Sequence, residues 1–535
     1  MKRTIIALTV CLVFAFILSS CGTSSSTTTP LTPSPASTSV PPTSAPATTQ
    51  ASKYGGTLRI IGSAPGTPMG YPAEAAAGSF ATTNYCTDML LRGDDKGNLN
   101  PALATSYDID PGSPNSSINF HLRKGVKFQD GSDFNAQALK WNLEMLKSSP
   151  LQANVTNSWT SFEVIDDYTF KVNMTAWQNR FVAVFGNSPT QIVSPTAYQK
   201  NGLDWMRWNI VGTGPFVQTD FQRDVVFKAK RYNNYWETGK PYVDELQLLY
   251  VVDPVTCKAL FLSGGVDVWG LGGNLLMASE LQAAGYPLVQ LMVGGNHLMP
   301  DSMNADSPWS NPKVRMAAEY AIDKESITKS LGYGFLTASY QVPSPYALAY
   351  NPNLTPRKYD VTKAKQLLAE AGYPSGFKTT LIFGNNTNKD IAVAVQASLA
   401  NVGIQANLEI TEPAKTSQYM TGKWYNALLF GSPAESPNFS ITLNAFFRPG
   451  SGPGLWMSVK KPDGYEPAYT AALTSPQPDA ALLKKCTDLF YNDATVIPLF
   501  NAPSLWVTGK NLQDSGFGKR MSMVQSNPQD AWFKK

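Results

Sequence analysis

The segment Gly212-Thr213-Gly214-Pro215 divides the chain into two parts of different character. Short runs of alternating apolar and polar residues precede it, whereas a strand-rich run and then amphipathic helical patterns follow it. The two glycines permit positive φ and the proline then fixes φ, so the segment indicates a sharp non-helical junction. It is either a tight turn leading into a strand or the point where the chain returns to a main lobe after building an inserted subdomain. The order of the surrounding elements favours the second interpretation.

The first 20 residues are typical of a secretory leader. Lys2 and Arg3 precede an apolar run over residues 5–18, which is shorter than the ~20 residues needed to span a bilayer. The run ends in Leu18-Ser19-Ser20-Cys21, which resembles the bacterial lipobox, so we expect cleavage before Cys21 and lipidation of that cysteine. A short anchor that stays uncut is the alternative, and the small residues before Cys21 disfavour it.

Residues 21–52 are rich in Ser, Thr, Pro and Ala and carry no charged side chain. Such a composition cannot bury a core, so it predicts an extended and disordered linker. Together with lipid on Cys21, it would anchor the protein to the outer face of the bacterial cytoplasmic membrane or hold it in the periplasm.

Composition narrows the functional classes. The formal charge of +4 falls to +2 when Lys2 and Arg3 leave with the leader, which argues against a nucleic-acid partner. A hydrophobic content of 43% is ordinary for a globular protein, and no second long apolar run predicts a membrane span. A chain of this length is expected to form two or more lobes.

The cysteines and histidines indicate neither a disulfide framework nor a metal site. Cys86, Cys257 and Cys486 remain after the leader and the lipidated cysteine are set aside, so at most one disulfide can form. The two histidines, His121 and His297, are isolated, and no Cys/His spacing is typical of zinc. We therefore expect no metal and no cofactor.

The sequence pattern of the first part of the chain predicts short strands. Ile118, Phe120 and Leu122 alternate with polar residues, which is the period of a half-buried strand. Alternating runs on either side of Asp166-Asp167 predict a hairpin.

The sequence pattern of the second part predicts an α/β lobe. Asn311 and Asp360 are expected to cap two amphipathic helices, and residues 391–402 carry a third apolar stripe. A strand over 404–410 follows, and Val496–Phe500 is a late strand placed to return to the first lobe.

Several stretches occur in an order that resembles a known family. They are Gly55–Leu58, Phe120–Phe128 with Asp130-Gly131, Gly212–Phe216, Val314-Arg315 through Asp323, Asp360–Ala364, Leu367–Pro374 and Ile497–Leu499. Together they resemble the peptide/nickel class of extracellular solute-binding proteins that serve ABC importers. In that class Arg315 and Asp323 are expected to stabilise helix ends or lobe packing.

The resemblance implies an α/β, two-lobed periplasmic-binding-protein-like type II fold with an extra subdomain inserted in lobe I. Solute is held in the cleft between the lobes, and hinge closure buries it. The expected divisions are a leader over 1–20, a linker over 21–52, lobe I over 53–85, 212–298 and 493–535, the inserted subdomain over 86–211 and lobe II over 299–492.

Residues 429–439 match the segment that holds the α-amine of the peptide in peptide binders of this class. Gly431, Pro437 and Phe439 fit that pattern, but Ser432 stands where Trp is usual and Ser436 where Asp precedes Pro. Glu435 is the remaining carboxylate, either as the amine anchor or as a solvated loop charge. The candidate ligand-binding residues are Gly431, Ser432, Glu435, Asn438, Trp456, Tyr85 and Trp309.

These observations favour a binding protein over an enzyme. The chain lacks the G-x-S-x-G, H-E-x-x-H and G-x-x-x-x-G-K-[ST] motifs. We expect a monomer that delivers an oligopeptide-like solute to a permease and an ATPase on separate chains. The alternatives are an oligosaccharide or another non-peptide solute, a role as a sensory receptor and, less favoured, a hydrolase.

Overall fold

The computed structural model describes residues 52–112, 114–385, 387–433, 435–450, 456–518 and 528–535. The expected leader, Cys21 and, apart from Ser52, the linker lie outside these residues. Ser52–Lys535 form one compact unit of mixed α/β structure. Within the described residues, no helix combines the length and the apolar character that crossing a bilayer requires.

An 11-stranded sheet organises this unit, in the order β15-β14-β16-β12-β17-β11-β1-β10-β9-β8, with β13 paired to β17. The strands are β1 (Thr57–Ile61), β8 (Phe216–Gln222), β9 (Val226–Arg231), β10 (Glu245–Leu249), β11 (Val268–Gly272), β12 (Leu288–Pro300), β13 (Thr337–Ala338), β14 (Phe377–Gly384), β15 (Ile404–Thr411), β16 (Ala427–Gly431) and β17 (Ile497–Thr508).

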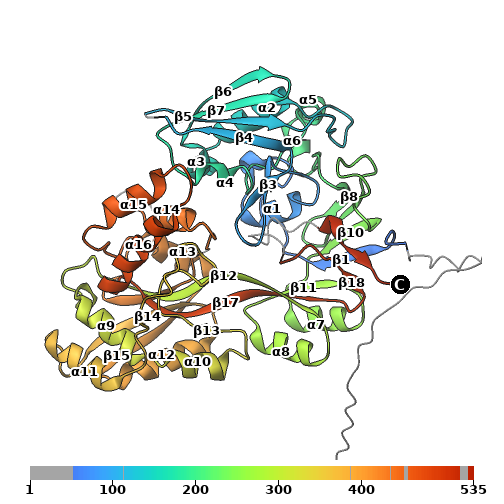
Figure 1. Cartoon of the computed structure of the whole chain (residues 1–535). Helices are drawn as coiled ribbons and strands as arrows, with labels where there is room; N and C mark the ends of the chain where they lie inside the picture. The colour runs from blue at the N-terminus through green and yellow to red at the C-terminus, as the bar shows by residue number, and fades with distance from the viewer. Residues whose placement is uncertain (1–51, 113, 386, 434, 451–455, 519–527) are drawn as a thin grey trace, which may run out of the picture. The chain divides into compact units, whose positions relative to one another are not determined.

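Two long strands connect the two halves of this sheet. β12 has 13 residues and β17 has 12, and they pair antiparallel over most of their length. One end of β17 pairs with β11, whereas the opposite end of β12 pairs with β16. In Figure 1, α7 (Pro254–Leu262) and α8 (Leu275–Ala283) lie below the right-hand end of this pair. The helices α9 (Pro312–Ala321), α10 (Lys324–Leu331), α11 (Val361–Glu370) and α12 (Lys389–Ala400) lie below its left-hand part.

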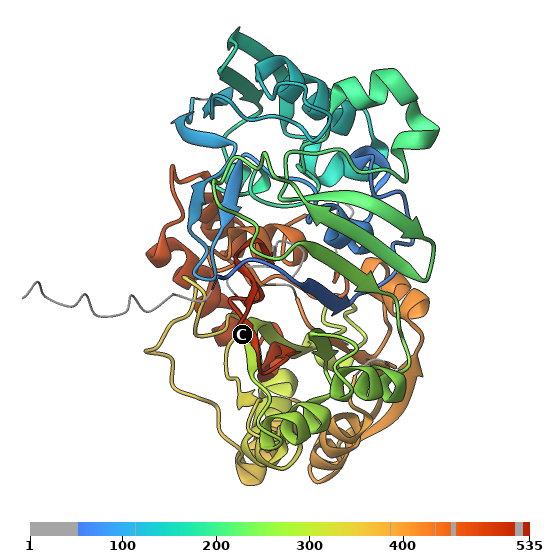
Figure 2. The same cartoon turned by 90° about the vertical axis from the view of Figure 1, so that its right-hand side faces the viewer.

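A separate four-stranded antiparallel sheet, in the order β4-β5-β7-β6, lies apart from the large sheet in both views (Figures 1 and 2). Its strands are β4 (Ala104–Asp110), β5 (Ser116–Leu122), β6 (Trp159–Asp166) and β7 (Thr169–Met174). Ile118 and Phe120 are fully buried, as the alternation predicted, and the hairpin around Asp166-Asp167 is confirmed. Together with α2 (Ala136–Lys147), these strands enclose their own hydrophobic core.

The helical second part is also confirmed. Asn311 caps α9 (Pro312–Ala321) by accepting from the Lys313 amide, and Asp360 caps α11 (Val361–Glu370) by accepting from the Lys363 amide. Asp323 caps α10 (Lys324–Leu331) through the Ser326 amide. α12 (Lys389–Ala400) leads into β15, which pairs parallel with β14.

The remaining elements complete the order. They are α1 (Ala77–Thr83), β2 (Leu91–Gly93), β3 (Leu99–Pro101), α3 (Ala153–Thr156), α4 (Phe181–Val184), α5 (Pro195–Asn201), α6 (Leu203–Met206), α13 (Pro413–Thr421), α14 (Ser440–Phe446), α15 (Tyr465–Thr474), α16 (Ala480–Asp493), β18 (Leu512–Gln513) and β19 (Trp532–Phe533).

The Gly212–Pro215 junction has a different physical basis from the one the sequence suggested. Neither Gly212 nor Gly214 has positive φ. A Cβ on Gly212 would lie 2.3 Å from the carbonyl oxygen of Cys86, and a Cβ on Gly214 would lie 2.4 Å from the Thr87 nitrogen. The glycines are therefore needed because two backbone segments approach closely, not because the turn is left-handed.

Candidate functional site

β16 ends at Gly431, which pairs with His297 of β12, and the candidate loop follows it. A Cβ on Gly431 would lie 3.0 Å from Cζ2 of Trp456, so the glycine leaves room for that indole ring. This packing fixes the start of the loop against the long strand β12.

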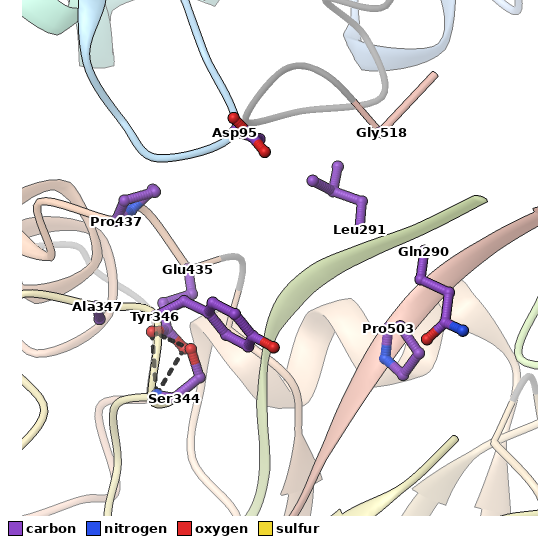
Figure 3. Close-up of a pocket in the computed structure, with 10 residues that line it drawn as sticks. All are labelled: Asp95, Gln290, Leu291, Ser344, Tyr346, Ala347, Glu435, Pro437, Pro503 and Gly518. Atoms are coloured by element: carbon purple, nitrogen blue, oxygen red, sulfur yellow. Dashed lines mark hydrogen bonds between the residues drawn. The ribbon is translucent and has the colours of Figure 1, made fainter. Parts of the chain in front are cut away.

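Farther along the loop, the Glu435 carboxylate is half-buried and held by uncharged donors (Figure 3). The Ser344 amide donates to both carboxylate oxygens, at 3.0 and 3.1 Å, and the Ser344 hydroxyl donates to Oε1 at 2.8 Å. Gly294 lies behind it, where an added Cβ would be 2.9 Å from the Glu435 Cβ and from the Pro433 carbonyl oxygen. Glu435 is thus a positioned carboxylate rather than a solvated loop charge.

Burial raises the pKa of the Glu435 carboxyl to about 7, although hydrogen bonds from Ser344 and from the Gly295 amide favour the ionised form. Loss of water is the larger effect because none of these donors carries a charge. The group is therefore poised near neutral pH, and a cation beside it would favour ionisation.

A cavity of about 160 Å³ opens beside Glu435. Its walls come from the β2–β3 hairpin, β12, the segment after β13, the loop after β16, β17 and the segment after β18. Figure 3 shows the lining residues, which are Asp95, Gln290, Leu291, Ser344, Tyr346, Ala347, Glu435, Pro437, Pro503 and Gly518. The two acids among them, Asp95 and Glu435, face a cavity whose described walls carry no Lys, Arg or His. Such a site can accept a cationic group.

Of the other candidates in the 429–439 segment, Pro437 also lines this cavity, whereas Gly431, Ser432 and Asn438 do not. Ser432 is exposed. Asn438 is half-buried, and its Oδ1 accepts from the Ser440 amide at 3.0 Å at the start of α14. Neither residue contributes to the cavity wall beside Glu435.

The three aromatic candidates belong to the core. Trp309 is fully buried, and its Nε1 donates to Thr379 Oγ1 at 3.0 Å. Trp456 is also fully buried, packs on Phe446 and Phe447, and contributes to the wall of a different cavity of about 630 Å³. Tyr85 is 6% exposed within an apolar cluster. None of the three lines the Glu435 cavity. Large aromatic rings are mostly buried in protein cores, and these three follow that tendency.

Sequence reasoning missed Ser344, Tyr346 and Asp95. Ser344 meets Glu435 across 91 positions of the chain, so no local pattern pairs them. Asp95 lies in an Asp-Asp-Lys-Gly turn, which indicates a hairpin tip but not what the tip faces.

The structure shows no metal-binding arrangement among the residues it describes. No group of three or more His, Cys, Asp or Glu side chains is placed to hold an ion there. Cys86, Cys257 and Cys486 are free and buried. Burial lowers the pKa of His297 to about 3, so this histidine is a neutral core residue.

Comparison with known proteins identifies the family. The model for bacterial extracellular solute-binding proteins, family 5, matches residues 98–454. The chain belongs to this family. It is 30% identical over 478 residues to the glutathione-binding protein GsiB of Salmonella choleraesuis, which covers 83% of this chain and 89% of that relative.

Solved structures show the same two-lobed periplasmic-binding-protein fold. One is the ABC transporter-associated protein DppA from Helicobacter pylori in complex with the peptide STSA, with a TM-score of 0.72, 24% identity, and coverage of 90% of this chain and 99% of that one. Another is NikA from Brucella suis in complex with Fe(III)-EDTA, with a TM-score of 0.76, 21% identity, and coverage of 89% and 100%. A peptide and a metal chelate thus occupy one fold, so the solute must be argued from the site.

Proposed function

We propose that this extracellular solute-binding protein captures an oligopeptide with a free amino terminus and delivers it to an ABC permease and ATPase on separate chains. The observation that carries the proposal is the Glu435 carboxylate, which faces the cavity with only uncharged donors around it. A partly dehydrated carboxylate that has no cation among the described residues beside it gains most from a charged donor, and the ammonium of a peptide supplies one. The names of its relatives, which include glutathione and the peptide STSA as ligands, agree with a peptide solute.

The arrangement of β12 and β17 supports capture by hinge closure. Both strands line the cavity, through Gln290 and Leu291 on β12 and Pro503 on β17, while Asp95 comes from the β2–β3 hairpin. A solute that contacts both sides of the cavity binds the closed state more tightly and shifts the population toward it. The protein releases its solute unchanged, as a binding protein rather than an enzyme.

The lobe divisions named above remain part of this proposal: lobe I over 53–85, 212–298 and 493–535, the insertion over 86–211, and lobe II over 299–492. In support, the Gly214 amide donates to the Cys86 carbonyl at 3.0 Å, so the proposed entry and exit of the insertion lie side by side. Lipidation of Cys21 is also proposed, and mass spectrometry of the mature amino terminus tests it.

Glu435→Gln tests the proposed function. Calorimetric titration with tri-alanine should give an affinity roughly 10- to 100-fold weaker than for the wild type, since a charge-assisted hydrogen bond is lost. N-acetylated tri-alanine, which lacks the ammonium, should bind both proteins equally weakly. Ser432→Ala, an exposed position in the same loop, is the matched control and should bind as the wild type does. Unchanged affinity in Glu435→Gln would exclude Glu435 as the anchor.

A further inference from the structure

A second cavity, of about 310 Å³, lies beside the Glu435 cavity. Asn501 lines the second cavity and Pro503 lines the first, and these residues are two positions apart on β17. Residues at that spacing point to the same face of a sheet. Tyr346 belongs to both walls, and in Figure 3 its ring extends from the Glu435 side toward the long strands. The two cavities are therefore neighbours along one face of β17.

The second cavity is uncharged and rich in aromatic rings. Its ring-bearing lining residues are Tyr340, Tyr346, Tyr350, Tyr491, Pro345 and Pro356. The Tyr340 hydroxyl donates to Glu325 Oε1 at 3.0 Å, and the Tyr491 hydroxyl donates to the Thr355 carbonyl. These bonds hold two of the rings in place. The described walls carry no Lys, Arg, Asp, Glu or His, so a charged group would find no partner there.

Asn501 contributes an amide side chain to the lining of this cavity. Its side chain is 3% exposed, and Oδ1 has no hydrogen-bond partner in the described part of the chain. The Asn501 backbone pairs with Gly295 of β12 on one side and with Thr337 of β13 on the other. Both edges of the strand are thereby occupied by backbone pairing, and Asn501 forms part of the cavity wall. A buried acceptor left unpaired is costly, so it favours a ligand that brings a donor.

We propose that the second cavity is a subsite for the side chain of a tyrosine or tryptophan of the bound peptide. This inference rests on the proposed function and deepens it. The ring of the ligand stacks against Tyr346 and Tyr350 while its hydroxyl or indole N–H donates to Asn501 Oδ1. The amino terminus stays at Glu435, and Tyr346 forms the common wall between the two subsites.

Peptide series test the subsite by calorimetric titration. The probes are Ala-X-Ala and Ala-Ala-X, with X being Ala, Phe, Tyr, Trp or Lys. In at least one series the wild type should bind X = Tyr or Trp roughly tenfold more tightly than X = Ala, through ring contact and the new hydrogen bond. Phe should fall between Ala and Tyr because it lacks the donor, and Lys should give no gain.

Three variants test whether the tighter binding of Tyr and Trp peptides depends on the second cavity. Tyr350→Leu should remove most of the preference for rings, measured as the ratio of the affinities for X = Tyr and X = Ala. Asn501→Ala should bring the affinity for Tyr peptides down to that for Phe peptides, with thermal melting as the check on folding. Tyr359→Leu, a 44% exposed tyrosine outside both cavities, is the matched control and should behave as the wild type.

The outcomes separate this inference from the proposed function. If tri-alanine binds but no ring side chain adds affinity, or if the gain persists in Tyr350→Leu, the subsite is overturned and the peptide function stands. If no peptide of either series binds, both the subsite and the proposed peptide-binding function are excluded. Binding of maltotriose instead of peptides, lost in Tyr350→Leu, would overturn the assignment to a peptide side chain.

Discussion

Glu319 is a fully buried acid and Glu435 is a half-buried one, and the groups around them differ. Glu319, on α9, is 1% exposed and accepts from Arg357 Nη1 at 3.0 Å, and Lys324 and Arg315 also favour its ionised form. Glu435 receives hydrogen bonds from the Ser344 hydroxyl and from the backbone amides of Ser344 and Gly295, and the described walls of its cavity carry no cation. Glu319 has its counter-charges within the fold, whereas Glu435 has none among the described residues that line its cavity. This difference separates a structural acid from one that a ligand completes.

The largest expected effect concerns the structural acid. Arg357→Met should lower the free energy of unfolding by about 3–5 kcal/mol, because it leaves Glu319 buried without its hydrogen-bonded partner. Urea denaturation of the ligand-free protein measures it. Lys358→Met is the neighbouring control, since Lys358 forms an exposed ion pair with Glu325 at 3.6 Å, and it should cost less than about 1 kcal/mol. Equal urea midpoints for the two variants would contradict the view that Glu319 depends on Arg357 as its buried counter-charge.

Peptide affinity should depend on pH through Glu435. The ammonium binds the ionised carboxylate, and burial raises the pKa of Glu435 to about 7, so affinity falls as the pH falls through that value. Between pH 7.5 and 6.0 the affinity for tri-alanine should drop roughly five- to eightfold, because a free peptide amine stays mostly protonated in this range.

The ligand-free protein should show the complementary trend. The native pKa lies above the ordinary value of 4.5, so the stabilising contribution of protonated Glu435 is complete below about 4.5 and is lost as the pH rises through about 7. Glu435→Gln should lack both dependences. A wild-type affinity that is flat across this range would contradict the poised carboxylate.

The smallest effect is expected at Asp95, which is exposed on the β2–β3 hairpin. Asp95→Asn should weaken tri-alanine binding by roughly two- to fivefold at low salt, as for an exposed charge acting through water. The effect should disappear at high ionic strength, because salt screens exposed charges more strongly than buried ones. A loss as large as that of Glu435→Gln would mean that Asp95 is a second direct anchor. Calorimetry at two salt concentrations distinguishes the two results.

The strands and helices followed from the sequence wherever the information was local. Phe120 alternates with polar neighbours, and Asp360 precedes an apolar helical stripe; both features are visible within a few residues and both are confirmed. The sequence showed that Gly212 and Gly214 permit positive φ, but neither adopts it. Glycine is needed at these positions because the backbone at Cys86 and Thr87, more than 100 positions earlier, lies against them.

The aromatic candidates show the same limit. A tryptophan in a sequence is compatible with a cleft or with a core, and the structure places Trp309 and Trp456 in the core. The tyrosines of the second cavity carry no sequence pattern of their own. Tyr346 and Tyr491 line one cavity because β13, β17 and the end of α16 meet there.

The sequence by itself determined the α/β class, the order of elements, the helix caps and Glu435 as the carboxylate of its loop. These depend on periodicity and on capping residues, which act over one or two turns. Only the tertiary structure decided that Glu435 meets Ser344, that the described walls of the cavity beside it carry no cation, and that Asn501 lines a neighbouring cavity. Dehydration and counter-charge are properties of what surrounds a group in space, and residues distant in the chain supply them.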